Sequence, residues 1–266
     1  MRIYVGFDDT DNPGADQGTG KVARWFEDRL PDECRLEGVL RQQLLVNEDI
    51  PYTSHNSAAC MILDAPDHSL MQKLVADAIA HVEMHSLEGS DPGVCVVCEG
   101  DPSLSRLMDF GYLCTRKIVT QKEAIKAASS SHLSGHGGTN DGIIGAAAAV
   151  GLTASGWSGR FIEYGRLRDF PERISVAELE RSSMRVISVD RDAKIPAPED
   201  LVLTKGWLRP RLWGNRAVVL VTPIEEGVWE SVGEKRRNGK EAKQNHVALS
   251  VGPAIYSPSA RIRNCR

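Results

Sequence analysis

Apolar residues dominate the start of the chain from Arg2 to Phe7, where β-branched and aromatic side chains are frequent. This pattern predicts a β-strand. The acidic residues that follow, together with Pro13 and Gly14, cannot continue a strand, so we expect the strand to end beside them. Between residues 19 and 30 apolar positions recur at helical spacing, and Pro31 follows, which predicts a helix. The opening unit is therefore strand, loop and helix.

The same patterns alternate strands with helices as far as about residue 171. We expect strands over 36–46, 58–63 and 94–97, and helices over 69–81, near 103–110 and around 118–125. A glycine-rich element at 135–145 leads into a run of small residues, which predicts a closely packed helix. This alternation is typical of an α/β fold.

The texture of the chain changes after Pro171, where a linker-like segment at 192–200 and a strand at 217–222 stand out. We therefore predict two domains. An N-terminal α/β domain would cover residues 1–172, and a second, smaller domain would cover residues 173–266.

Composition indicates a folded globular protein. The 266 residues are 41% hydrophobic and 26% charged, with a mean hydropathy of -0.27, so the chain can bury a core without disulfide or metal support. The longest apolar stretch, 142–152, has about half the length that a bilayer requires. Acidic residues come too early for a secretory signal, so we expect a cytoplasmic protein without a membrane partner.

Six cysteines in such a chain are expected to be reduced thiols. Cys95 and Cys98 form a CxxC pattern, but they lie in an apolar run and no second pair completes a zinc set. Buried strand cysteines are therefore favoured over metal or redox chemistry.

The formal net charge of -4 gives no global attraction for polyanions, so nucleic acid binding would need a local basic face. The segment 205–243 is rich in Lys and Arg, Arg236 and Arg237 included, and contains Trp207, Trp213 and Trp229. A solvated surface with tryptophans in the core explains this segment equally well.

The acidic triplet Asp8, Asp9 and Asp11 is expected at the end of the first strand. Carboxylates crowded in this way repel one another unless a cation neutralises them, and Mg²⁺ prefers such oxygen ligands. The alternative is a solvated turn in which the aspartates accept hydrogen bonds from local amides.

Two glycine-rich loops precede predicted helices. Gly18-Thr-Gly-Lys21 resembles a phosphate-binding loop, although Val22 stands where a Walker A motif needs Ser or Thr. The second loop spans 135–145. Free backbone N–H groups at the start of a helix favour anion binding. Helix capping and close helix packing explain the glycines equally well.

The histidines are dispersed: His55 lies in a polar loop, and His132 and His136 flank the second glycine loop. No third metal donor and no GxSxG motif accompany them, so loop surface is the favoured interpretation and a hydrolase is not supported.

Several separated motifs, in one order, resemble the TiaS family, the archaeal synthetases that make 2-agmatinylcytidine in an isoleucine tRNA. The motifs are Gly6-Phe-Asp-Asp-Thr-Asp-Asn12, Gly18-Thr19, Leu45-Val-Asn-Glu-Asp-Ile-Pro-Tyr-Thr-Ser-His-Asn-Ser-Ala58, Asp91-Pro-Gly-Val94, Ile118-Val-Thr120, Gly142-Ile-Ile-Gly-Ala-Ala-Ala-Ala-Val-Gly151 and Phe161-Ile-Glu-Tyr-Gly-Arg166. The resemblance covers roughly residues 1–170 and implies the family's kinase-like domain. Residues 173–266 resemble its ferredoxin-like, agmatine-binding domain more loosely, which implies a smaller α+β domain there.

The resemblance implies ATP and Mg²⁺ as cofactors and phosphoryl transfer that activates an acceptor for amine addition. Thr19 would be the phosphorylated threonine of the family, and Asp8, Asp9 and Asp11 would be the catalytic and metal-binding carboxylates. Six further residues would bind the nucleotide: Gly18, Gly20, Lys21, Asn56, Gly142 and Gly145.

The sequence also departs from the family pattern. Ser54, His55 and Asp141 stand where the family has basic residues, and the tRNA-binding OB and zinc-ribbon domains are not found in the chain. Lost cations would weaken stabilisation of phosphate charge. The acceptor is therefore expected to differ from an intact tRNA. A non-catalytic binder of nucleotides or small molecules on the same scaffold, and a subunit that works with a separate tRNA-binding chain, remain the alternatives.

Overall fold

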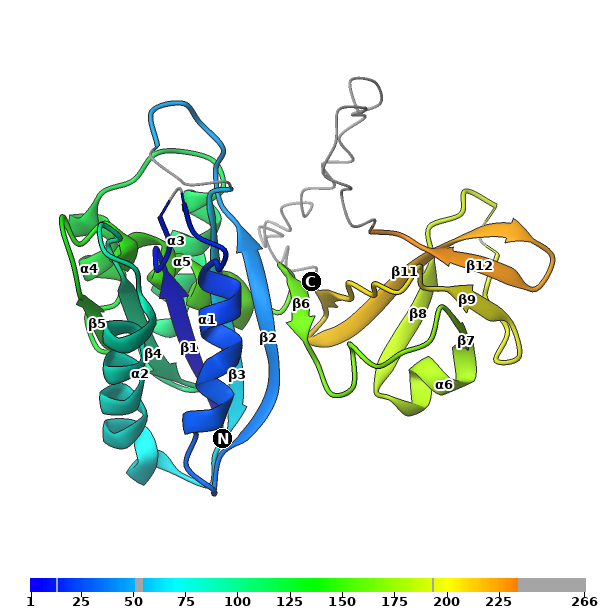
Figure 1. The fold of residues 1–266 in the computed structure, drawn as a ribbon, viewed down its shortest axis with the longest axis horizontal. Coiled ribbons are helices and arrows are strands. Elements are labelled where there is room, and N and C mark those ends of the chain that lie inside the picture. The colour runs from blue at the N-terminus through cyan, green and yellow to red at the C-terminus, as the bar shows by residue number, and fades with distance from the viewer. Residues whose placement is uncertain (13, 51–54, 193, 234–266) are drawn as a thin grey trace, which may run out of the picture. The chain divides into compact units, whose positions relative to one another are not determined.

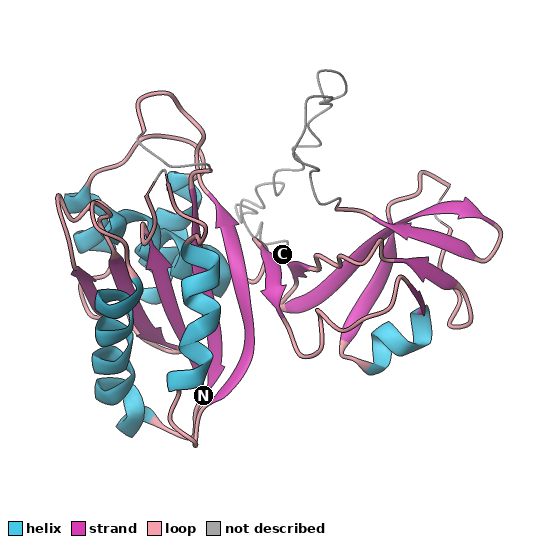
Figure 2. Ribbon diagram, in the orientation of Figure 1, coloured by secondary structure: helices cyan, strands magenta, loops and turns pink. Residues whose placement is uncertain are grey.

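The computed structural model describes residues 1–12, 14–50, 55–192 and 194–233. In this part of the chain, strands form a mixed α/β fold with helices, as the sequence predicts (Figures 1 and 2). The strands are β1 (Arg2–Asp8), β2 (Arg35–Gln43), β3 (Ser57–Asp64), β4 (Gly93–Cys98), β5 (His132–Gly135), β6 (Arg160–Glu163), β7 (Arg173–Ser175), β8 (Met184–Ser188), β9 (Leu201–Leu203), β10 (Arg211–Trp213), β11 (Arg216–Glu225) and β12 (Val228–Ser231).

The helices begin and end close to where the apolar periodicity places them. They are α1 (Thr19–Trp25), α2 (Met71–His85), α3 (Leu104–Cys114), α4 (Gln121–Ala127), α5 (Gly142–Ala154) and α6 (Val176–Arg181), with short 3-10 helices η1 (Phe26–Arg29) and η2 (His68–Leu70). Thr120 begins α4 with a capping box in which its side chain and that of Glu123 satisfy each other's backbone N–H groups.

The strands follow the order β5-β4-β1-β3-β2-β6-β10-β11-β12-β9-β7, and β8 pairs with β11. Every pairing from β5 to β6 is antiparallel. Because β1 and β4 run in opposite directions, the end of β1 and the start of β4 lie at the same edge of the sheet, where Asp8 is the register partner of Gly93. This edge holds most of the residues that the sequence singles out.

Helices cover both faces of the first half of the sheet. On one face Phe7 of β1 packs with Phe26, and Leu74 and Val82 of α2 complete this core. On the other face α5 lies against β1, β3 and β4, with α3 packed on it. Gly6 makes this approach close, since a Cβ there would overlap the Ala146 carbonyl of α5. The small residues of α5 therefore serve packing, as their composition predicts.

The C-terminal strand predicted at 217–222 lies inside β11, and the linker-like segment joins β8 to β9. The domain boundary near residue 172 stays a prediction. Cys95 and Cys98 are buried in β4 and free, so the expectation of strand cysteines is confirmed. Within the described ranges, α5 and the other helices are too short or too polar to cross a bilayer.

Candidate functional site

The edge where β1 ends is built by close contact between three segments. A Cβ on Gly93 would overlap the backbone of Gly142, and a Cβ on Gly142 would overlap the Asp91 carbonyl. The start of β4 and the start of α5 can therefore approach only because both positions lack side chains. The sequence predicts Gly142 as a nucleotide-binding residue, and here it also fixes the position of α5.

Asp8 points from the end of β1 toward α5. A Cβ on Gly145 would overlap the Asp8 carboxylate, so that carboxylate lies directly over the first turn of the helix. The sequence names both residues separately, and the structure brings them together.

Five aspartates from three segments gather around this point: Asp8, Asp9, Asp11, Asp91 and Asp141. We call them the acidic edge. Burial, followed by the charges of Asp9 and Asp11, raises the pKa of Asp8 to about 7. Burial, followed by the charges of Asp91 and Asp11, raises the pKa of Asp9 to about 6. Carboxylates are therefore held together here at an electrostatic cost that a cation would relieve.

The backbone of Asp9 adopts a left-handed conformation, with φ of 51°. Aspartate tolerates this conformation better than most residues, but it remains uncommon outside glycine. The chain turns sharply at this position, and the Asp9 carboxylate lies near Asp91, which precedes β4, and near Asp141, which precedes α5.

Thr19 is the first residue of α1 and is 6% exposed, with Gly18 as the N-cap. The Thr19 hydroxyl oxygen accepts hydrogen bonds from the backbone N–H and the hydroxyl of Thr10, at 3.4 Å and 3.2 Å. Thr19 therefore ties the acidic loop to α1. Asp11 lies on the same loop, with a carboxylate oxygen 3.2 Å from the position that a Cβ of Gly18 would take.

Asp91 and Asp141 order the second glycine-rich loop. Asp91 accepts hydrogen bonds from the backbone N–H of Thr139 at 2.9 Å and from its hydroxyl at 2.5 Å. Asp141 accepts one from the Gln121 side chain at 2.6 Å. Reasoning from the sequence misses Asp91 as a site residue, although its place just before a predicted strand is the available signal.

The other predicted nucleotide-binding residues make structural contacts of their own. Gly20 packs against Ile162, whose terminal carbon lies 2.9 Å from the place of a Cβ. Lys21 is exposed on α1, and its ammonium lies 5.1 Å from the centre of the Trp25 ring. Asn56 donates a hydrogen bond to the Leu45 carbonyl at 2.7 Å and so closes the loop between β2 and β3.

The three histidines that the sequence singles out lie in different surroundings. His55 is exposed, whereas Ser54 lies outside the described residues. His132 and His136 both contact the Ser134 hydroxyl, at 2.8 Å and 2.7 Å, and His136 Nδ1 lies 3.3 Å from a Glu83 oxygen. His132 and His136 are thus linked in a polar network, whereas the sequence favours a plain loop surface for them.

The tryptophans of the basic segment differ in their surroundings. Trp229 is buried, Trp213 is exposed, and Trp207 is half-buried beside two arginines. Lys235, Arg236, Arg237, Lys240 and Lys243 lie outside the described residues.

Solved structures of tRNA-modifying proteins resemble this chain. A tRNA fluorescent labeling enzyme has a TM-score of 0.48 and 27% identity, covering 57% of this chain and 36% of that protein. A complex of TiaS with an isoleucine tRNA and ATP has a TM-score of 0.49 and 27% identity with the same coverage. A complex of TiaS with the same tRNA, AMPCPP and agmatine has a TM-score of 0.48 and 22% identity, covering 69% and 44%.

This chain thus spans between about a third and less than half of the length of those proteins. Neither a protein-family model nor a curated protein matches it.

Among the described residues, no three His, Cys, Asp or Glu side chains are arranged to hold a metal ion by themselves. Mg²⁺ commonly takes one or two carboxylates and completes its shell with phosphate oxygens and waters. The oxygen donors of the acidic edge fit Mg²⁺ in that shared form, together with a phosphate-bearing ligand.

Proposed function

We propose that the protein is an enzyme that uses ATP and Mg²⁺ to transfer a phosphoryl group to an acceptor in the modification of RNA. The observation that carries this proposal is the acidic edge, where carboxylates from three segments converge beside the start of α5. Such a group is costly to bury without a cation, and clusters of carboxylates with raised pKa values are common at functional sites.

In this proposal Asp8 and Asp9 hold Mg²⁺, and Asp11 lies close enough to add to their charge. Bound Mg²⁺ would neutralise charge on the phosphoryl group during transfer. The second glycine-rich loop, which Asp91 and Asp141 order, would offer backbone N–H groups to the phosphates. Gly142 and Gly145 allow the start of α5 to lie against Asp91 and Asp8. Gly18 and Gly20 would play the same part at the start of α1.

Thr19 has two proposed roles, as a phosphorylated residue or as a positioning residue, and the two roles require different contacts of its hydroxyl. As a phosphorylated residue it would have to release the two hydrogen bonds from Thr10 and turn outward from a site that is 6% exposed. As a positioning residue it would keep these bonds and hold the acidic loop against α1. Mass spectrometry of the protein after incubation with MgATP distinguishes the two, since only the first adds a phosphate to Thr19.

The motif resemblance makes agmatine the first amine to test. The departures at His55 and Asp141 predict an acceptor other than an intact tRNA, so turnover is compared with and without tRNA. The alternative is a non-catalytic binder on the same scaffold, or a subunit of a larger assembly. One observation favours these alternatives: Lys21, the cation of the first glycine loop, stacks on Trp25. In that position it contributes less to the stabilisation of phosphate charge than a lysine directed at the phosphates.

The test is ATP turnover by the full chain, with and without tRNA and agmatine, in three proteins. Asp9→Asn removes a charge from the acidic edge, and Asp16→Asn removes one from an exposed position of the same loop. We expect turnover in the wild type and in Asp16→Asn, and a loss of about 100-fold or more in Asp9→Asn. Tight binding of MgATP without turnover would support the binder, and equal turnover in all three proteins would contradict the proposed site.

A further inference from the structure

Five arginines gather around β6. They are Arg24 of α1, Arg41 of β2, Arg160 of β6, Arg168 after β6 and Arg209 before β10. Arg41 and Arg160 are partners in the β2–β6 ladder. Arg24 and Arg168 both reach Glu163, at 3.7 Å and 3.0 Å. We call this group the arginine cluster.

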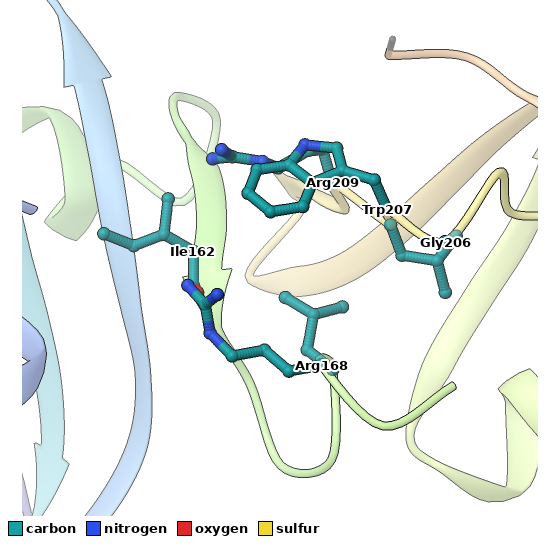
Figure 3. Close-up of a pocket in the computed structure, with 7 residues that line it drawn as sticks. Ile162, Arg168, Gly206, Trp207 and Arg209 are labelled. Atoms are coloured by element: carbon teal, nitrogen blue, oxygen red, sulfur yellow. The ribbon is translucent and has the colours of Figure 1, made fainter. Parts of the chain in front are cut away.

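A small pocket opens beside the cluster (Figure 3). Its volume is about 140 Å³, and its lining includes Ile162, Arg168, Trp207 and Arg209. The Arg209 guanidinium lies 4.2 Å from the centre of the Trp207 ring, and that of Arg168 lies at 6.0 Å. The indole therefore supports two guanidinium groups at the pocket wall, which reduces the entropy they lose on binding a ligand.

The positive charge of the cluster is poorly balanced. Glu163 forms ion pairs with two of the arginines. Within the described ranges, neither Arg160 nor Arg209 forms an ion pair. Burial, followed by the charges of the other four arginines, lowers the pKa of Arg209 to about 10, so its side chain still carries its charge at neutral pH.

We propose that the arginine cluster and its pocket bind a phosphate group carried by a nucleotide or by an RNA strand. Guanidinium groups match phosphate oxygens in pairs, and several of them together suit a dianion. A volume of about 140 Å³ is roughly the share of four or five waters, which suits a phosphate with its five heavy atoms. A cationic amine would be repelled here.

This inference goes beyond the proposed ATP site. The two sites share no residue, so a failure at the acidic edge leaves the phosphate site standing and the reverse also holds.

The experiment measures binding of two probes to the full chain: a labelled single-stranded RNA of about twelve nucleotides by fluorescence anisotropy, and AMP by calorimetry. Arg209→Gln is the principal variant, because Arg209 stacks on Trp207 and has no ion-pair partner within the described residues. Arg160→Gln is the second, in case the first does not fold. Arg181→Gln is the matched control, since Arg181 is exposed on α6.

We expect Arg209→Gln and Arg160→Gln to weaken binding of at least one probe about tenfold or more, and Arg181→Gln to leave it unchanged. Loss of RNA binding alone, with a smaller salt dependence, identifies an RNA strand as the source of the phosphate. Loss of AMP binding identifies a free nucleotide. Equal binding by all four proteins, or displacement of either probe by agmatine in an arginine-dependent way, would overturn the proposal.

Discussion

The acidic edge and the arginine cluster are two concentrations of like charge in one chain, and they differ in how they are built. Three of the five aspartates fall within four residues of sequence, at the end of a single strand. The five arginines come from positions between 24 and 209. Three members of the acidic edge lie close together in the sequence and can be read from it, whereas Asp91, Asp141 and the whole arginine cluster join only after folding.

The two regions also differ in the residues that pack against their charged side chains. At the acidic edge, glycines admit the carboxylates, and Gly145 lies directly under Asp8. At the arginine cluster, an indole and a shared glutamate hold the guanidinium groups. Each arrangement costs stability through like-charge repulsion, which an oppositely charged ligand would offset. Substitutions that change the charge or the space in either region should therefore change the stability of the fold and the binding of its ligand.

The largest effect is expected from Gly145→Val. The added side chain would overlap the Asp8 carboxylate, so we expect a loss of about 2 kcal/mol or more in the free energy of unfolding together with loss of ATP turnover. Urea denaturation measures the first. Gly14→Ala is the control, because its Cβ would meet nothing closer than an Asn12 oxygen at 3.7 Å. Equal stability of Gly145→Val and Gly14→Ala would contradict the described packing.

The next effect is a pH dependence of stability. The folded-state pKa of Asp8, about 7, lies above its ordinary 3.8, so the folded state binds more protons between these values and stability falls as pH rises through them. In Mg²⁺-free buffer we expect a fall of about 2 kcal/mol between about pH 5 and pH 8, allowing for solvent screening. Thermal unfolding of Asp8→Asn should show a flatter profile, and an identical profile would exclude Asp8 as its origin.

A smaller effect is expected from Thr19→Val. The buried acceptor for Thr10 is lost, which should lower the free energy of unfolding by about 1 kcal/mol, while Thr19→Ser keeps the hydroxyl and most of that energy. Urea denaturation measures this change in the free energy of unfolding. If Thr19→Ser is as unstable as Thr19→Val, the Thr19 methyl group and not its hydroxyl stabilises the loop.

The smallest effect is expected from Lys21→Ala. Its contact with Trp25 at an exposed site is worth about 0.5 kcal/mol. If Lys21 also binds the nucleotide, as its motif predicts, the Kd for MgATP rises about tenfold or more, whereas a purely structural Lys21 leaves the Kd unchanged. Calorimetry with MgATP distinguishes the two outcomes.

Local patterns made most of the secondary structure predictable. The strand that ends at Asp8, the helix that begins at Thr19 and the small-residue helix at 142 each follow from neighbouring residues. Contacts between distant segments could not be predicted. The contact of Asp8 with Gly145, the closeness of Asp9 to Asp91 and the sharing of Glu163 by two arginines depend on how distant strands and helices pack, which residue spacing does not encode.

Asn56 shows what a sequence motif leaves undetermined about a residue. Its place in a family-like motif predicts a nucleotide contact, which stays a prediction, and the structure adds that its amide N–H closes the β2–β3 loop through the Leu45 carbonyl. A motif gives the type and position of a residue, but the partners of its polar atoms follow only from the fold.

Calorimetric titration of MgATP into the wild type, Asp9→Asn and Asp16→Asn tests the nucleotide site at the acidic edge directly, at about pH 8, where Asp8 and Asp9 are ionised. We predict binding by the wild type and by Asp16→Asn, and a Kd at least about tenfold higher for Asp9→Asn. The same Kd for all three proteins, or no binding by the wild type at millimolar MgATP, would contradict an ATP and Mg²⁺ site at the acidic edge.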